Sequence, residues 1–431
     1  MCRLFVPLAL ALTSLAGAGA LAQTDEGSRR AVPPSVATAT VSVSAYAAPP
    51  LTLAAAIRTA LESNPALSAA RREIEATEGA RLQASVFQNP TLSAQIEDTR
   101  RDTRTSTVLL SQPIELGGKR GARIDAAERG IDVARAQLEV RSAELRADVT
   151  AAFFAALIAQ ERVQLAQRSL ELAGRGSLAA SNRVRVGKVS PIEETKAKVA
   201  EAGVRLEFVQ AQGELRTGLT QLQALMARPM AARTLDGDAV ALPQPVPAEM
   251  LEARLRDAPS MRQARLEVRR FAALAELERA KRMPDITLTA GGMRDQQLGR
   301  NQAVIGVSIP LPIFDTNRGN FIEASRRQDK AEDDALALEL RLRADAGAAR
   351  QRHDTALAEV DVLQKEILPG AQTAFDAATT GFEFGKFAYL DVLDAQRTLL
   401  LARSQYLRAL AEVHRAATDL DRLLGGASPT P

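Results

Sequence analysis

The fold of this chain is decided by the stretch Gly385-Lys386-Phe387-Ala388-Tyr389-Leu390-Asp391-Val392-Leu393-Asp394-Ala395. One helical pattern ends at Gly385 and another begins just after it. Because glycine readily takes positive φ, Gly385 is predicted to form the tip of a helical hairpin. The second helix carries apolar residues at seven-residue spacing, which predicts a coiled-coil seam. These residues are Val392, Leu399, Tyr406, Val413 and Leu420.

The same tip occurs earlier in the chain. Gly187-Lys188-Val189-Ser190 corresponds to Gly385-Lys386-Phe387-Ala388, and Arg120-Gly121 corresponds to Arg318-Gly319. Both offsets, 385 − 187 and 318 − 120, equal 198 residues. A constant offset over this distance predicts a duplicated unit. We therefore expect a first repeat at 51–227, a linker at 228–247, a second repeat at 248–425 and a tail at 426–431.

The N-terminus has the pattern of a secretory signal peptide. Arg3 precedes an apolar run at 4–15, and Ala20-Leu21-Ala22 fits a cleavage site between small residues. Cleavage after Ala22 would remove Cys2, the only cysteine of the chain. The segment from there to residue 50 is rich in Ser, Thr, Ala and Pro and is predicted to be extended.

The composition favours close-packed helices over a thick globular core. Hydrophobic residues make up 46% of the chain but aromatic residues only 3%, and much of the apolar content is alanine. The 55 basic and 52 acidic residues are interleaved, which is typical of solvated helix surfaces. There is no basic block that would favour nucleic-acid binding.

Two hairpins are predicted, with strands at about 90–114 and about 285–313. In each, apolar and polar residues alternate with the period of two that β-strands show. The strands have about the length needed to cross a bilayer when tilted. The same pattern also fits soluble hairpins that cap a helical bundle. The alternating apolar residues are Leu92, Ala94, Ile96, Val108, Leu110, Ile286, Leu288, Ala290, Ile305, Val307 and Ile309.

A long helix follows each hairpin. The first, at 119–186, has 68 residues and would be about 100 Å long. Bends are expected at Gly174, at Gly176 and, in the second copy, at Pro369-Gly370. The return helices at 191–226 and 389–424 are about half as long, so the short helices before the strands are expected to stack on their ends.

The sequence gives little sign of catalysis. His353 and His414 lie in helical patterns without a cysteine or carboxylate pair at ligand spacing, so surface or packing roles are expected. Gly117-Gly118-Lys119-Arg120 lacks the spacing of a phosphate-binding loop. We expect no enzyme activity, no cofactor and no metal site.

Asp391 and Asp394 are the strongest candidate functional residues. They share one helical face just past the second tip. They could line a functional entrance, or they could simply complement the helix dipole. At the matching places of the first copy stand Glu193 and Lys196, so the turn itself does not require two acids.

Taken together, these features resemble the TolC family of outer-membrane efflux channels. The resemblance is sharpest in the tip sequence quoted above and in two strand-exit runs. The run Gln112-Pro113-Ile114-Glu115-Leu116-Gly117-Gly118-Lys119-Arg120 is similar to the cobalt–zinc–cadmium resistance branch of that family. The second run is Ile309-Pro310-Leu311-Pro312-Ile313-Phe314-Asp315.

The resemblance implies a mainly helical fold with a β-barrel part. Three chains would share a twelve-stranded barrel in outer-membrane lipid and a periplasmic helical tunnel. The tips at 187–190 and 385–388 would dock a periplasmic adaptor protein, itself bound to an inner-membrane pump of the RND type. Asp391 and Asp394 would line the entrance. The function implied is a passive exit duct for divalent cobalt, zinc and cadmium.

Two alternatives stay open at this stage. The same architecture could export drugs or small organic compounds. A soluble periplasmic coiled-coil scaffold without a pore would also fit the heptads.

Overall fold

The computed structural model describes residues 50–229, 234–244 and 246–426. They belong to one compact unit, residues 48–431, whereas the other unit, residues 1–47, lies outside the described part. The predicted signal peptide, the extended segment up to residue 49 and nearly all of the predicted tail therefore lie outside the described residues.

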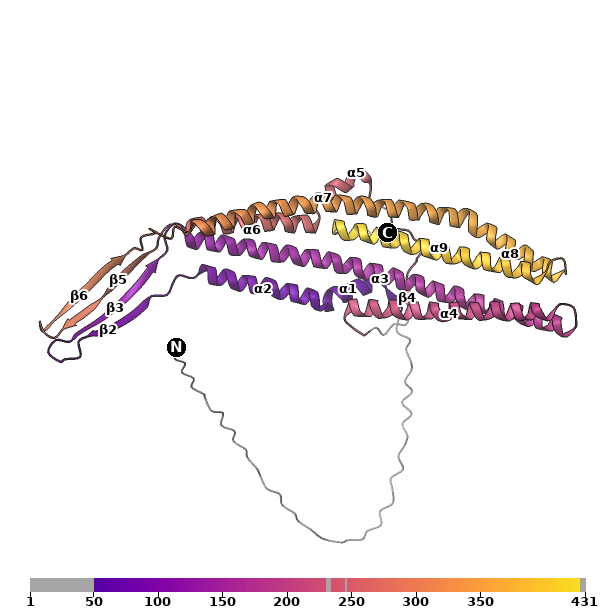
Figure 1. Ribbon diagram of the computed structural model, residues 1–431, viewed down its shortest axis with the longest axis horizontal. Coiled ribbons are helices and arrows are strands. Elements are labelled where there is room, and N and C mark those ends of the chain that lie inside the picture. The colour runs from indigo at the N-terminus through magenta and orange to yellow at the C-terminus, as the bar shows by residue number, and fades with distance from the viewer. Residues whose placement is uncertain (1–49, 230–233, 245, 427–431) are drawn as a thin grey trace, which may run out of the picture. The chain divides into compact units, whose positions relative to one another are not determined.

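The chain runs twice through short helices, a β-hairpin, a long helix and a return helix (Figure 1). The first pass contains β1 (Leu51–Thr52), α1 (Leu53–Ser63), α2 (Pro65–Ser85), β2 (Thr91–Glu97), β3 (Thr105–Ile114), α3 (Lys119–Arg185) and α4 (Pro191–Met226). The connection contains β4 (Leu235–Asp236). The second contains α5 (Ala248–Arg256), α6 (Pro259–Ala280), β5 (Ile286–Asp295), β6 (Arg300–Ser308), α7 (Arg318–Val362), the π-helix η1 (Leu363–Ile367), α8 (Leu368–Glu383) and α9 (Tyr389–Leu424).

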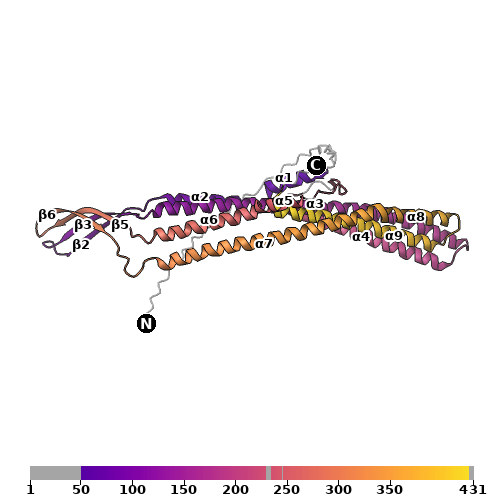
Figure 2. The same ribbon diagram turned by 90° about the horizontal axis from the view of Figure 1, so that it is seen from above.

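The short helices stack on the ends of the return helices, as predicted. Asn64, which caps α2, donates from Nδ2 to the carbonyl oxygen of Leu225 at the end of α4 at 2.9 Å. In the second copy, Gly425 ends α9 with φ of 70° and lies so close to Pro259 that a Cβ would stand 2.2 Å from the proline ring. A return helix and a short helix thus share one line beside the long helix (Figures 1 and 2).

The two predicted hairpins form one antiparallel sheet in the order β2-β3-β5-β6. Its register sorts the side chains into two faces. One face has apolar rows, such as Leu92, Leu110, Ala290 and Ile305. The other face is largely polar, with rows such as Thr91, Ser111, Thr289 and Gly306. The apolar side chains are solvent-exposed in the single chain, 86% for Ile305.

The main core lies where α1, α3, α4, α7 and α9 meet. Small residues allow the close helix approach that the alanine content predicted. Gly218 of α4 lies against Ala156 of α3, where a Cβ would be 3.2 Å from the alanine Cα. The largest buried side chains there are Phe153, Leu67, Leu157, Leu222, Leu410, Val149 and Val413.

The connection between the copies is built into this core, which the sequence did not predict. β4 pairs in parallel with β1. The Gln160 side chain acts as a further partner: its Nε2 donates to the Leu235 carbonyl oxygen at 3.2 Å, and its Oε1 accepts from the Leu235 amide at 3.0 Å. Gly237 packs on Phe153, with 3.3 Å from an added Cβ to the ring.

The second long helix changes geometry near the expected bend. The π-helix η1 joins α7 to α8 with the helical backbone unbroken, and Pro369 follows two residues after it. The wider turn thus lies where the proline removes one backbone N–H from the helix. In the first copy, Gly174 and Gly176 lie inside the continuous helix α3. In the described part of the chain, none of the helices has an apolar stretch long enough to span a bilayer.

Candidate functional site at the helical tips

The first tip joins α3 to α4 through a glycine turn. Gly187 has φ of 71°, and the amides of Gly187 and Lys188 donate to the carbonyls of Val184 and Arg183, each at 2.9 Å. These bonds satisfy the last carbonyls of α3. Ser190 then caps α4 by accepting from the Ile192 amide at 3.4 Å.

The second tip repeats this geometry between α8 and α9. Gly385 has φ of 72°, and the Lys386 amide donates to the Gly381 carbonyl at 2.8 Å. The ring of Phe387 lies over Gly381, so closely that a Cβ added to Gly381 would stand 2.1 Å from the nearest ring carbon. The positive φ predicted at both tips is therefore present. Both tips lie at the same end of the helices, opposite the sheet (Figures 1 and 2).

Asp391 caps the helix that follows the second tip. The serine of the first tip is replaced by Ala388, which has no acceptor in its side chain. Asp391 makes a different capping bond: its Oδ2 accepts from the Ala388 amide at 2.9 Å, whereas Ser190 accepts from the Ile192 amide within α4. The capping interpretation of the sequence thus has a structural basis for Asp391.

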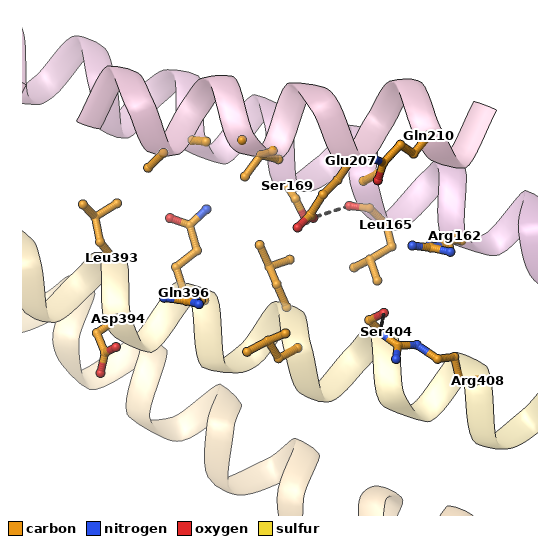
Figure 3. Close-up of a pocket in the computed structure, with 18 of the residues that line it drawn as sticks. Arg162, Leu165, Ser169, Glu207, Gln210, Leu393, Asp394, Gln396, Ser404 and Arg408 are labelled. Carbon is orange, nitrogen blue, oxygen red and sulfur yellow. Dashed lines mark hydrogen bonds between the residues drawn. The ribbon is translucent and has the colours of Figure 1, made fainter. Parts of the chain in front are cut away.

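Asp394 occupies a different environment from Asp391. It is exposed and stands one turn farther along α9, at a groove of about 610 Å³ between the α3–α4 hairpin and α9. Figure 3 shows Arg162, Glu207 and Gln210 on one wall and Gln396, Ser404 and Arg408 on the other. The structure therefore brings both acids to the tip region while giving a capping hydrogen bond to Asp391.

A contact between the two hairpins holds the tips together. The guanidinium of Arg183 in α3 lies 3.8 Å from the ring centroid of Phe382 in α8. The Phe382 ring is 5.4 Å from that of Tyr389, which is buried against the α3–α4 hairpin. Burial raises the pKa of the Tyr389 hydroxyl above its ordinary value. Its oxygen fits over Gly176, where an added Cβ would be 2.5 Å away. The sequence did not predict this contact, and the role expected for Gly176 was a bend.

The two histidines lie in the core and not at the tips. The His414 ring stacks on Phe154 at 3.8 Å, and its Nε2–H donates to the Ala239 carbonyl at 2.9 Å. His353 is fully buried. Burial is the main reason that the pKa of His414 is lowered. Of the two roles expected for them, packing is confirmed. The described residues contain no group of three or more His, Cys, Asp or Glu side chains arranged to hold a metal ion.

Comparison with known proteins identifies the family. The model of the outer membrane efflux protein family matches residues 56–228 and again 250–426. The chain belongs to this family. The two matched segments contain one glycine tip each, at Gly187 and Gly385. Membership places the protein in the outer membrane as an efflux channel, with the helices forming its periplasmic extension.

Curated relatives include metal-resistance proteins. The cobalt-zinc-cadmium resistance protein CzcC of Cupriavidus metallidurans is 47% identical over 428 residues, covering 99% of this chain and 100% of that protein. The nickel-cobalt-cadmium resistance protein NccC of Alcaligenes xylosoxydans xylosoxydans is 27% identical over 333 residues. The matched region covers 75% of this chain and 74% of that protein.

Solved structures have the same fold. The outer membrane protein VceC of Vibrio cholerae has a TM-score of 0.74 at 20% identity, covering 87% of this chain and 96% of that one. The open-state MtrE channel of Neisseria gonorrhoeae also has a TM-score of 0.74, at 22% identity, covering 87% and 89%. The predicted fold class, long helices with β-hairpins of the TolC type, is confirmed.

Proposed function

We propose that three copies of this efflux protein form the exit duct of a tripartite system that exports divalent cobalt, zinc and cadmium. The duct is passive. An inner-membrane pump of the RND type supplies the energy, and a periplasmic adaptor connects the two. The identity of 47% over the full length of a cobalt-zinc-cadmium resistance protein carries the metal assignment.

The sheet supports assembly into a trimer. Among the described residues, β2 and β6 each have one neighbouring strand, so both edges of the sheet present open backbone groups. Lipid cannot satisfy such groups, so further copies must close the edges. Three sheets of four strands would give a closed barrel whose apolar face meets lipid and whose polar face lines the pore.

The α4 helix supports the same assembly. Its outward face carries exposed apolar residues at seven-residue spacing, Ile192, Val199 and Leu206. Such a row is suited to a coiled-coil contact with a neighbouring copy. Val199→Glu should therefore weaken the trimer, whereas Arg205→Glu, at an exposed position of the same helix about 120° around it from Val199, should not.

Metal export is tested in cells. A strain lacking the gene should accumulate more zinc, cobalt and cadmium and should grow poorly in their presence, and the gene on a plasmid should restore both. Sensitivity to drugs should stay unchanged. Normal metal content combined with increased drug sensitivity would instead favour export of organic compounds.

The tips are proposed to dock the adaptor through residues Gly187 to Ser190 and Gly385 to Ala388. They project from the helix ends farthest from the sheet (Figure 1). A photo-crosslinking amino acid at Lys188 or Lys386 should capture the adaptor in cells. The same probe at Arg100, in the loop between β2 and β3, should not. Capture from Arg100 alone would contradict this placement.

Asp391 and Asp394 are proposed to line the entrance of the trimer with six carboxylates. A narrow ring of carboxylates favours cations. Asp391→Asn with Asp394→Asn keeps the shapes and removes the charges. Trimer yield should hold, while cation selectivity and block by trivalent cations in planar bilayers should fall. Unchanged selectivity and block would leave both acids with structural roles only.

Capping and charge can be separated at Asp391. Asp391→Asn retains an oxygen that can accept from the Ala388 amide, whereas Asp391→Ala does not. We expect the alanine variant alone to destabilise the first turn of α9, by about 1 kcal/mol. Hydrogen exchange of the amides in that turn measures the difference, and Asp394→Ala is the control.

A further inference from the structure

The two repeats meet in the sheet at the pairing of β3 with β5 (Figure 1). β3 belongs to the first repeat and β5 to the second, and all ten residues of each strand are paired, beginning with Thr105 opposite Asp295. We call this pairing the repeat junction. A slip of one residue along it would turn Leu288 and Ala290 from the apolar to the polar face, because side chains alternate between the faces. The register of the repeat junction therefore decides which side chains line the pore of the proposed barrel.

Gly291 fits the observed register for a steric reason. It lies opposite Leu109. A Cβ added to Gly291 would stand 2.0 Å from the carbonyl oxygen of Val108 and 2.8 Å from Leu109 Cδ2. A backbone carbonyl inside a strand ladder cannot turn aside as a flexible side chain can. Any residue other than glycine would therefore push the two strands apart at this point.

The neighbouring glycine has no such close contact. The nearest atom to a Cβ added to Gly292 would be the Gln302 carbonyl oxygen, at the ordinary distance of 3.8 Å. A slip of one residue could bring Gly292 opposite Leu109, but that slip would exchange the two faces of β5. The pattern of the faces thus excludes slips of one residue, and only Gly291 is left to fit beside the carbonyl.

Slips of two residues keep the faces but bring a different side chain to the close approach. The residue opposite Leu109 would then be Thr289 or Met293, depending on the direction of the slip. Both have a Cβ that points to the same face as Gly291. No other glycine of β5 lies on that face. The observed register is therefore the only one of these that keeps the faces and places a glycine beside the Val108 carbonyl.

Hydrogen bonds beyond the ladder hold both ends of the repeat junction. At the end nearer the helices, Asp285 Oδ1 accepts from the Leu116 amide at 3.0 Å and from Lys119 Nζ at 2.7 Å. At the far end, the Gln296 amide donates to the Arg104 carbonyl oxygen at 3.0 Å. Each bond joins a residue of the first repeat to a residue of the second. The strand-exit run at 112–120 thus takes part in holding the register, through Leu116 and Lys119.

We propose that Gly291 determines the register of the repeat junction and that Asp285 holds its helix-side end. Both are positioning residues: they set which side chains of β3 and β5 face the pore and at what level. The consequence for the pore rests on the proposed barrel. The register itself is a property of the single chain.

Disulfide trapping measures the register directly. In a full-length chain with Cys2→Ser, the native reporter combines Met293→Cys with Thr107→Cys, which are opposite each other in the structure. The slip reporter combines Met293→Cys with Thr105→Cys, which would be opposite each other after a slip of two residues. The three side chains share the polar face of the sheet. Mass spectrometry of peptides from the oxidised, detergent-purified protein gives the fraction of chains that each reporter cross-links.

Alanine at the two neighbouring glycines tests the steric argument. Gly291→Ala should lower the cross-linked fraction of the native reporter about tenfold, because the added methyl group separates the strands beside the Val108 carbonyl. Gly292→Ala is the matched control and should leave that fraction unchanged. Equal fractions in the two variants would show that the close approach does not matter.

Moving the glycine tests whether it selects the register. The swap variant carries Thr289→Gly and Gly291→Thr, so its glycine lies two residues nearer the start of β5. With Asp285→Ala added to free the helix-side end, we expect cross-linking to pass from the native to the slip reporter. Retention of the native cross-link, or loss of both cross-links, would contradict selection by the glycine. With Asp285 intact the change should be smaller, and an equal change would contradict its holding role.

These results do not depend on the trimer, because each reporter joins two strands of one chain. A monomer that keeps the native cross-link, and loses it in Gly291→Ala alone, would leave the register inference standing and contradict only the barrel. A trimer whose Gly291→Ala variant cross-links normally would contradict the register inference and leave the barrel standing.

Discussion

Arg183 and Phe382 connect the two halves of the molecule across 199 residues of sequence. The guanidinium lies on the phenylalanine ring, and Arg183 Nη2 also donates to the Phe382 carbonyl oxygen at 3.3 Å. The two residues come from different repeats, so their contact sets the distance between the two hairpin tips. Movement of one tip against the other must break or move this contact.

Loss of the Arg183 contact should therefore loosen the tips. A cation–π contact of this kind contributes about 0.5–1 kcal/mol at a partly exposed site. Spin labels on Lys188→Cys and Lys386→Cys report the distance between tips, in trimers diluted with unlabelled subunits. We expect Arg183→Ala to broaden the distance distribution, and Arg183→Lys to broaden it less. In a double-mutant cycle, Phe382→Leu should add little to Arg183→Ala. Independent effects would contradict direct coupling.

Gly174 and Gly176, two residues apart in α3, should respond oppositely to substitution by alanine. Gly174 has open space around it, whereas a Cβ on Gly176 would stand 2.5 Å from the Tyr389 hydroxyl oxygen. Gly174→Ala should stabilise the helix by about 0.5–1 kcal/mol, because alanine has the higher helix propensity. Gly176→Ala should lower the thermal unfolding midpoint, and Tyr389→Phe should restore it in the Gly176→Ala background. Equal effects of the two alanines would show that the close approach to Tyr389 is unimportant.

The buried His414 should make the folded protein sensitive to acid. Its folded-state pKa lies below the ordinary value, mainly because burial disfavours the charged form; nearby His353 adds to this, while the Ala239 bond and Asp238 oppose it. As the pH falls below the unfolded-state pKa of about 6.5, the unfolded chain binds a proton that the folded chain does not. The stabilising contribution of the neutral His414 should therefore be complete above this pKa. The free energy of unfolding should decrease as the pH falls from there toward the lowered folded-state pKa. His414→Phe should flatten this part of the profile measured by denaturant unfolding; an unchanged slope would contradict it.

Local patterns predicted the elements of this fold well. Alternation predicted β2, β3, β5 and β6, and glycine chemistry predicted the tips at Gly187 and Gly385. When one face of a strand or helix is apolar, apolar residues recur at the period that its backbone geometry sets, 2 or 3.6 residues, so the element can be read from the sequence. The repeat offset also showed that Ser190 is replaced by Ala388, so the loss of the serine cap at the second tip could have been inferred.

Contacts between the two repeats could not be predicted in the same way. Arg183 meets Phe382, and Tyr389 meets Gly176, only because two hairpins pack side by side. Neither pair has a fixed sequence spacing. The burial of His353 and His414 depends on the same packing of α7 and α9 against α3. A glycine within a helix signals close approach as readily as a bend, and Gly176 alone cannot distinguish them.

The central claim is that the open sheet edges are closed by two further copies of the chain. Native mass spectrometry of the detergent-purified protein, with its mature N-terminus determined from the same sample, tests this directly. The account predicts a single species with three times the mass of the mature chain, soluble only while detergent is present. A monomer that stays soluble after detergent removal would contradict it and would favour a soluble coiled-coil scaffold.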